Sequence, residues 1–224
     1  MNETREKVRA IIVEDESLFR DLLRVALSQS QEVDVVGSYG DGVVAIAAAP
    51  ELQPQVAILD INLGNNMNGV QVGLRLRQLL PSIGILLLSN HSYPQVINTL
   101  PPEAAHGWSY LLKKSISNVH TLERAITGSA AGFVVLDPNL VTAGRPKEGG
   151  RVSRLTPRQR EILRLIAQGY TNRAVAESLV ISEKSVENQV NLIYQDLVVD
   201  RSDSGVQPRV TAVLIYLQEM QFQP

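Results

Sequence analysis

The chain of 224 residues contains no cysteine, which excludes disulfides, thiolate nucleophiles, iron–sulfur clusters and thiolate zinc sites. Its three histidines, His91, His106 and His120, are too few for a histidine-rich metal site. No run approaches the roughly 18 apolar residues of a membrane span, and the first ten residues lack the apolar core of a signal peptide. We therefore expect a soluble, cytoplasmic protein without membrane contact.

The chain also has little excess of charge of either sign, since its formal net charge is only −2. This excludes a uniformly basic protein that coats nucleic acid, but it does not exclude a local basic patch. Apolar residues make up 44% and charged residues 20%, a globular composition that excludes a disordered chain. The length suits one large domain or two small ones.

The first half alternates short apolar runs with amphipathic segments, a pattern typical of parallel strands joined by crossover helices. The apolar runs are Val8–Val13, Val33–Gly37, Val56–Leu59, Ile83–Leu88 and Trp108–Leu112. Helical spacing follows in segments around Leu18–Leu27, Val70–Leu80 and Leu122–Ile126. The pattern predicts an α/β domain of five strand–helix units.

The composition of the sequence changes near Ala143. Residues 143–154 are rich in Gly, Lys and Arg and read as an exposed linker. We therefore predict one domain over residues 1–142 and another over 155–224. In the second, Thr156 opens a helix with a capping box to Gln159, and Thr171 and Ser182 begin two more helices. A fourth helix starts at Pro208.

Polar residues stand at the carboxyl ends of four predicted strands, where open parallel sheets bind ligands. They are Glu14 with Asp15, then Asp60, Ser89 and Lys113. Carboxylate oxygens suit Mg²⁺, and a central carboxylate can be a nucleophile toward phosphorus. Taken singly, each acid is more often a turn former or a helix cap, but their co-occurrence at one sheet edge favours a chemical site.

These residues and their order resemble a response-regulator receiver domain with a flavodoxin-like (βα)5 fold, over residues 8–131. The resemblance implies that Asp60 accepts phosphate from a sensor histidine kinase, with Glu14 and Asp15 as the acidic pair. It implies Mg²⁺ held by Asp15, Asp60 and the Asn62 backbone carbonyl. Further implied roles are phosphoryl contacts for Ser89 and Lys113 and a switch role for Tyr110. Such a domain is not an enzyme beyond slow self-dephosphorylation.

Two departures qualify the resemblance. The loop after Asp60 reaches Gly69 one residue later than usual and lacks a proline. In the region of the fourth helix, Pro94 starts a segment that Pro101 and Pro102 must end early. The route that transmits phosphorylation is therefore an open question.

The last helices predict a helix-turn-helix, whose later helix enters the DNA major groove. Residues Leu155–Leu197 resemble the LuxR-type helix-turn-helix of NarL/FixJ response regulators. The resemblance places contacts to double-stranded DNA on Lys184, Ser185, Glu187, Asn188 and Asn191. It places homodimer contacts on Val210, Val213, Leu214 and Leu217, for which ordinary core packing is an equal alternative. Residues 198–208 exceed the usual connection and read as a surface loop.

Charge is unevenly divided in this part of the chain. Residues 145–173 hold eight Lys or Arg against two Glu, whereas residues 174–224 hold three against seven acids. Few cations predict weak non-specific DNA binding with a shallow salt dependence, so affinity would come from a dimer on two half-sites.

We expect a transcription regulator that is phosphorylated on Asp60 and dimerises on DNA. One alternative is a phosphorylation-independent transcription factor whose receiver is a dimerisation or ligand-binding module. Another is a Mg²⁺-dependent phosphatase or phosphotransferase, which the absence of a further acid–base carboxylate and of a substrate cap disfavours.

Overall fold

The chain folds into two compact units. A computed structural model describes residues 6–64, 67–91, 102–116, 118–199 and 207–221. Unit 1 comprises Met1–His91 with Gly107–Gly132, and unit 2 comprises Ser92–His106 with Phe133–Pro224. Each unit is described by itself below.

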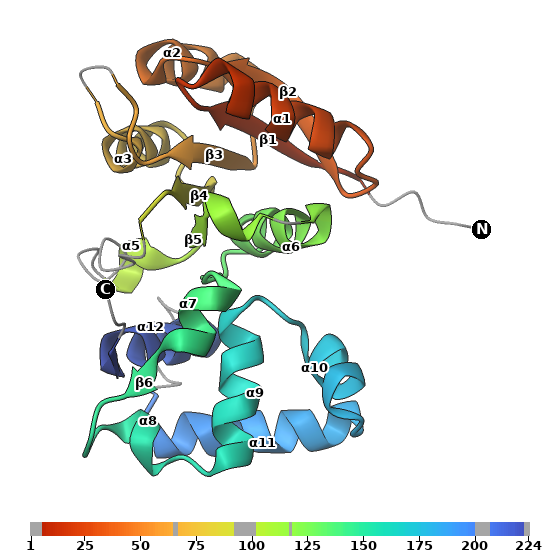
Figure 1. Ribbon diagram of the computed structural model, residues 1–224, viewed down its shortest axis with the longest axis vertical. Helices are drawn as coiled ribbons and strands as arrows, with labels where there is room; N and C mark the ends of the chain where they lie inside the picture. The colour runs from red at the N-terminus through yellow and green to blue at the C-terminus, as the bar shows by residue number, and fades with distance from the viewer. Residues whose placement is uncertain (1–5, 65–66, 92–101, 117, 200–206, 222–224) are drawn as a thin grey trace. The chain divides into compact units, whose positions relative to one another are not determined.

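Unit 1 is built on a five-stranded parallel sheet in the order β2-β1-β3-β4-β5 (Figure 1). The strands are β1 (Val8–Val13), β2 (Val33–Tyr39), β3 (Val56–Asp60), β4 (Gly84–Ser89) and β5 (Trp108–Leu112). Every residue of β3, β4 and β5 is buried, as expected for strands covered on both faces. The predicted α/β fold is therefore confirmed.

The strand register brings the carboxyl ends of the strands to one edge. Val13 pairs with Leu59, and Ser89 pairs with Leu112 on the far side of β4. The polar residues that follow these positions therefore emerge beside one another.

Helices cover the sheet by packing in pairs, α1 beside α6 and α2 beside α3. Their bounds are α1 (Ser17–Ser28), α2 (Gly42–Leu52), α3 (Gly69–Leu79) and α6 (Val119–Ala130), with a short 3₁₀ turn η1 (Lys113–Ser115). Asp41 and Asn118 cap α2 and α6, and Asn68 forms a capping box with Gln71 at α3. By contrast, the side chain of Glu16, the residue before α1, makes no capping bond.

Unit 2 is helical. Its main helices are α9 (Pro157–Ala167), α10 (Asn172–Leu179), α11 (Glu183–Asp196) and α12 (Pro208–Glu219). Thr156, Thr171 and Ser182 cap the first three of these, as predicted, and Gln159 completes the capping box of α9. The short elements are α5 (Pro102–Ala105), α7 (Pro138–Ala143), β6 (Arg145–Pro146), α8 (Arg151–Arg154) and β7 (Met220–Gln221).

The segment predicted as an exposed linker, residues 143–154, is ordered within unit 2. It contains β6, which pairs antiparallel with β7, and α8, whose Val152 is fully buried. Glu219 holds the segment, because its carboxylate accepts hydrogen bonds from Arg151 Nε at 2.8 Å and from the Val152 amide at 2.9 Å. These partners lie almost 70 residues away in sequence, and a local composition pattern cannot indicate them.

Two sequence features lie wholly or partly outside the described residues. Pro94 and Pro101 lie outside the described residues, so the structure does not describe the predicted early end of the fourth helix. Most of the 198–208 connection is likewise undescribed. None of the helices in the described ranges combines the length and apolar character that crossing a bilayer requires.

Candidate functional site

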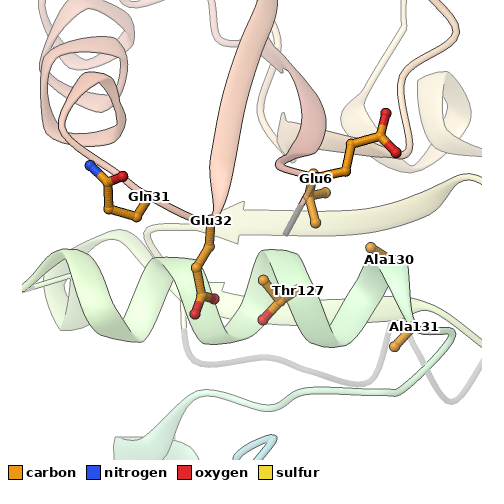
Figure 2. Close-up of a pocket in the computed structure, with 7 residues that line it drawn as sticks. Glu6, Gln31, Glu32, Thr127, Ala130 and Ala131 are labelled. Atoms are coloured by element: carbon orange, nitrogen blue, oxygen red, sulfur yellow. The ribbon is translucent and has the colours of Figure 1, made fainter. Parts of the chain in front are cut away.

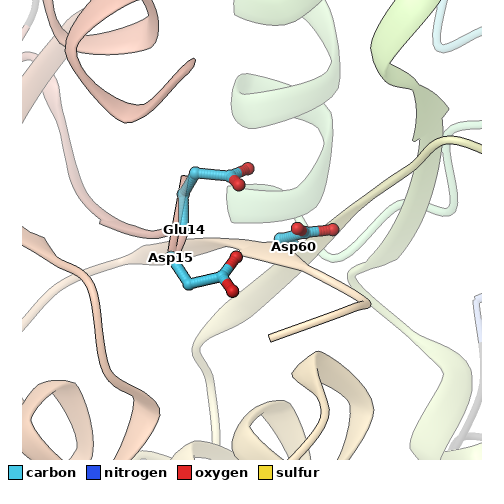
Figure 3. Close-up of side chains that lie close together, drawn as sticks. All are labelled: Glu14, Asp15 and Asp60. Atoms are coloured by element: carbon cyan, nitrogen blue, oxygen red, sulfur yellow. The ribbon is translucent and has the colours of Figure 1, made fainter. Parts of the chain in front are cut away.

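The acidic residues predicted from strand ends meet in unit 1. Glu14 and Asp15 follow β1, and Asp60 ends β3. One carboxylate oxygen from each lies within 4.8 Å of the other two, and the three side chains turn toward one another (Figure 3). Two of them are buried, with Asp60 4% and Glu14 1% exposed, whereas Asp15 is exposed. The cluster therefore joins two desolvated carboxylates to one that solvent reaches.

Lys113, which follows β5, supplies the opposing charge. Its Nζ lies 2.8 Å from Glu14 Oε2 and 2.9 Å from Asp60 Oδ2, and its side chain is only 8% exposed. The ammonium also lies 4.6 Å from the centroid of the Phe19 ring on α1. One lysine thus bridges both buried carboxylates over an aromatic face.

Burial and charge shift the pKa of two of these groups. Burial raises the pKa of Glu14, and the nearby charge of Asp60 adds to this, although Lys113 opposes it. Burial by itself lowers the pKa of Lys113, but hydrogen bonds to Glu14 and Asp60 outweigh burial and raise it overall. Lys113 is therefore held in its charged form.

Backbone amides of the loop after β3 orient the carboxylates of Asp60 and Asp15. The Asn62 amide donates to Asp60 Oδ1 at 3.1 Å, and the Gly64 amide donates to Asp15 Oδ2 at 2.9 Å. The loop returns at Gly69, where a Cβ atom would lie 2.1 Å from the Asp60 carbonyl oxygen. Only glycine fits at this position, so the altered loop length still closes tightly beneath Asp60.

Ser89 and Tyr110 meet at the end of β4. Ser89 Oγ donates to the His91 carbonyl at 3.2 Å and accepts from the His91 amide at 3.0 Å. The Tyr110 hydroxyl donates to the same carbonyl oxygen, and the Tyr110 side chain is buried. A single backbone carbonyl therefore links the two residues for which phosphoryl-contact and switch roles are predicted.

The donor set fits a hard divalent cation. Three carboxylates converge, one of them open to solvent, and the site offers no sulfur or histidine ligand among its described residues. Oxygen donors with few protein ligands suit Mg²⁺, which keeps several waters. The pocket formed by Glu14, Asp15 and Asp60 could therefore bind a metal ion.

In unit 2, the predicted DNA-contact residues lie on α11. Val186, Val190 and Ile193 face the core of the unit. Lys184, Ser185, Asn188 and Asn191 are exposed, and Glu187 is half-buried. The helix thus presents a polar stripe opposite its apolar one, as a groove-reading helix requires.

The residues nominated for dimerisation are buried. Val210, Val213, Leu214 and Leu217 of α12 are between 0% and 5% exposed. Of the two readings left open by the sequence, this favours core packing, because a side chain already buried in its own chain has little surface to offer a second copy. Their dimer role therefore stays a prediction, for which burial in the single copy favours the alternative of core packing.

The sequence does not indicate two contributors to the acidic site and one structural acid elsewhere. Phe19 beneath Lys113 was assigned only to an apolar stripe, and the Gly64 amide carries no side-chain signal. In unit 2, the sequence counts Glu219 only among the seven acids of residues 174–224, and nothing local indicates its bond to the Val152 amide. Each acts through a contact distant in sequence.

A cavity of about 500 Å³ lies elsewhere in unit 1 (Figure 2). It is lined by Glu6 and Val8 near the start of β1, by Gln31 and Glu32 before β2, and by Thr127, Ala130 and Ala131 at the end of α6. The cavity therefore sits at the amino ends of the strands, at the edge opposite the acidic cluster, and is not part of that site.

Comparisons with known proteins match both units. Residues 10–127 match the response regulator receiver domain, and residues 153–202 match the bacterial regulatory proteins of the luxR family. The chain is 33% identical to the probable transcriptional regulatory protein NarL of Mycobacterium tuberculosis, covering 95% of this chain and 94% of the relative. It is 31% identical to the transcriptional regulatory protein DegU of Brevibacillus brevis, covering 92% and 96%.

Among solved structures, two RcsB dimers bound to two parallel DNAs give a TM-score of 0.51 at 23% identity, covering 96% of this chain and 99% of that one. At that identity the likeness concerns the fold alone. The family resemblance seen in the sequence is confirmed by the matched regions and the full-length relatives. The chain therefore belongs to the DNA-binding response regulators, which join a receiver domain to a LuxR-type helix-turn-helix.

Proposed function

We propose that this protein accepts a phosphoryl group on Asp60 from a sensor histidine kinase and, once phosphorylated, dimerises on double-stranded DNA to control transcription in the cytoplasm. The observation that carries the proposal is the bridge from Lys113 to Glu14 and Asp60 at 2.8–2.9 Å. It holds a buried carboxylate at the sheet edge with a fixed positive charge beside it, where a transferred phosphoryl group would need one.

Asp60 is the nucleophile in this proposal. One of its carboxylate oxygens forms a bond to phosphorus while the bond from phosphorus to the donor histidine nitrogen breaks. Lys113, already bound to Asp60 Oδ2, would pair with a phosphoryl oxygen, and the Ser89 hydroxyl would donate to another. Slow hydrolysis of the acyl phosphate would reset the protein.

Asp15, Asp60 and the Asn62 backbone carbonyl would hold Mg²⁺. When bound, this ion offsets the negative charge that gathers on the transferred group. Glu14 would remain paired with Lys113, because burial leaves it little access to water. The exposed side chain of Asp15 keeps the pocket open to an incoming donor.

Tyr110 is the residue that we expect to transmit phosphorylation to the rest of the protein. The His91 carbonyl accepts from both Ser89 Oγ and the Tyr110 hydroxyl. If Ser89 turned to a phosphoryl oxygen, this carbonyl would lose one donor and its bond to Tyr110 would change. Phosphorylation would thereby reach a buried aromatic side chain without any direct contact between Tyr110 and the phosphoryl group.

Unit 2 would bind DNA through α11 in the major groove. The basic residues of 145–173 would supply the phosphate contacts. The rest of the unit is acidic and adds few cations, so the number of phosphate contacts stays low. We therefore expect weak binding by a single copy, a shallow salt dependence, and a dimer as the source of affinity. A salt slope as steep as that of a strongly basic repressor would contradict this.

The chemistry can be tested with the full chain, acetyl phosphate and Mg²⁺. We expect the intact mass to rise by one phosphoryl group, the adduct to be cleaved by hydroxylamine as an acyl phosphate is, and Asp60→Asn to stay unmodified. Asp41→Asn, which changes an acid that caps α2 instead, should be modified like wild type. No adduct on wild type, or an equal adduct on Asp60→Asn, would refute phosphorylation at Asp60. Unchanged transcription by Asp60→Asn would favour the phosphorylation-independent alternative.

A further inference from the structure

The exposed stripe of α11 carries the base-reading capacity of unit 2. Lys184, Asn188, Asn191 and Gln195 are exposed and recur every three or four residues, so they follow one side of the helix, and exposed Ser185 lies beside them. Core packing does not explain their identities, because none of them is buried.

The charged and hydroxyl members of the stripe are already engaged. Lys184 Nζ donates to Glu187 Oε2 at 2.9 Å, and Ser185 Oγ lies 2.8 Å from the Oγ of the capping residue Ser182. Lys184 occupies Glu187 Oε2, so the lysine is already paired and is less available to a phosphate. With Glu183 in the same turn, one Lys stands against two Glu, so this turn carries no excess positive charge.

Three carboxamides remain, on Asn188, Asn191 and Gln195, and the first two lie nearer the amino end of the helix, the part of a recognition helix that contacts base edges. Asn188 and Asn191 are exposed, and neither side chain makes a hydrogen bond to any residue that the structure describes. Each carboxamide offers a donor and an acceptor together, which matches the N7 acceptor and N6 donor of adenine in the major groove. Three residues rise about 4.5 Å along a helix, comparable to the step of about 3.4 Å between base pairs.

We propose that Asn188 and Asn191 read the major-groove edges of adenines at neighbouring positions of each operator half-site. The Lys184–Glu187 pair and Glu183 give this turn no excess positive charge, which disfavours binding by charge alone. The inference rests on the proposed DNA binding and adds the base chemistry that the binding selects.

The test begins with selection of duplexes from a random pool by the full chain in Mg²⁺ and beryllofluoride. The enriched half-site should contain adenines at adjacent or nearly adjacent positions. Replacing one such adenine by 7-deazaadenine removes the N7 acceptor but preserves base pairing, and it should weaken binding by wild type about tenfold. The same replacement outside the half-site is the matched control and should have no effect.

The variants assign the contact. Asn188→Ala or Asn191→Ala should weaken binding to the natural site and become insensitive to 7-deazaadenine at the adenine that the lost side chain reads. Both residues are exposed and alanine favours a helix, so both variants should retain the wild-type melting temperature within a few degrees.

The outcomes separate the two proposals. Failure to enrich any sequence would overturn the DNA-binding proposal together with this inference. An enriched site that lacks adenine, or variants that keep full sensitivity to 7-deazaadenine, would overturn the adenine reading while DNA binding stands.

Discussion

Replacing Lys113 by methionine tests how the acidic pocket is held together. Methionine keeps a long apolar stem over Phe19 but removes the ammonium that bridges Glu14 and Asp60. At an effective dielectric constant of about 20, each contact at 2.8–2.9 Å contributes about 6 kcal/mol before desolvation is subtracted. Desolvation of the three groups removes most of this energy, and breaking a buried pair costs about 3–5 kcal/mol in practice.

We therefore expect Lys113→Met to lower the free energy of unfolding of unit 1 by about 3–5 kcal/mol in the absence of Mg²⁺. With a urea dependence of about 2 kcal/mol per molar, the unfolding midpoint falls by about 2 M. Trp108 is the chain's single tryptophan and is buried in β5, so its fluorescence reports the unfolding of unit 1 alone.

The adjacent Lys114 provides a matched control. Its side chain is exposed, so Lys114→Met makes the same chemical change outside the pocket and should alter stability by less than about 0.5 kcal/mol. If the two variants lost the same stability, or if Lys113→Met matched wild type, the bridge would not stabilise the unit and the electrostatic reading of the pocket would be refuted.

Three further predictions concern other parts of the molecule. Mg²⁺ at ten times its dissociation constant should stabilise unit 1 by about 1.4 kcal/mol in the Trp108 assay, and Asp15→Asn should abolish this gain. Burial alone would raise the pKa of Glu219, but bonds from Val152 and Arg151 lower it overall, so its contribution to stability is complete above pH 4.5 and lost as the pH falls further. In thermal melts followed by circular dichroism, Glu219→Gln should therefore be less stable than wild type at pH 7, with a difference that shrinks in acid; a constant difference would contradict this. Val180 is a β-branched residue at φ 53° with 90% exposure, so Val180→Gly should stabilise unit 2 by about 0.5–1 kcal/mol in the same melts, and a loss of stability would contradict the strain argument.

The sequence predicts the parts of the fold that depend on local patterns. The strand Val8–Val13 has the predicted bounds, and Thr156 with Gln159 forms the capping box expected before α9. Buried parallel strands and helix caps have short, self-contained signatures, which explains this success. The helix Gly42–Leu52 was not singled out, because its segment is apolar all round and shows no amphipathic period.

Contacts between distant residues could not be read in the same way. The order of polar residues at strand ends predicted that Glu14, Asp60 and Lys113 would meet, because a parallel sheet brings strand ends together. Composition around residues 143–154 suggested a free linker, whereas Glu219 binds it through two hydrogen bonds. Composition describes a segment by itself and carries no information about a partner elsewhere in the chain.

Sedimentation velocity of the full chain in Mg²⁺, with and without beryllofluoride, tests most directly whether Asp60 controls assembly. Beryllofluoride mimics the acyl phosphate on a competent acceptor, and Asp60→Asn provides the comparison. The account predicts that wild type shifts from monomer to dimer when beryllofluoride is added, whereas Asp60→Asn stays monomeric. A wild type that does not respond, or a wild type and variant that are both dimeric from the start, would contradict it.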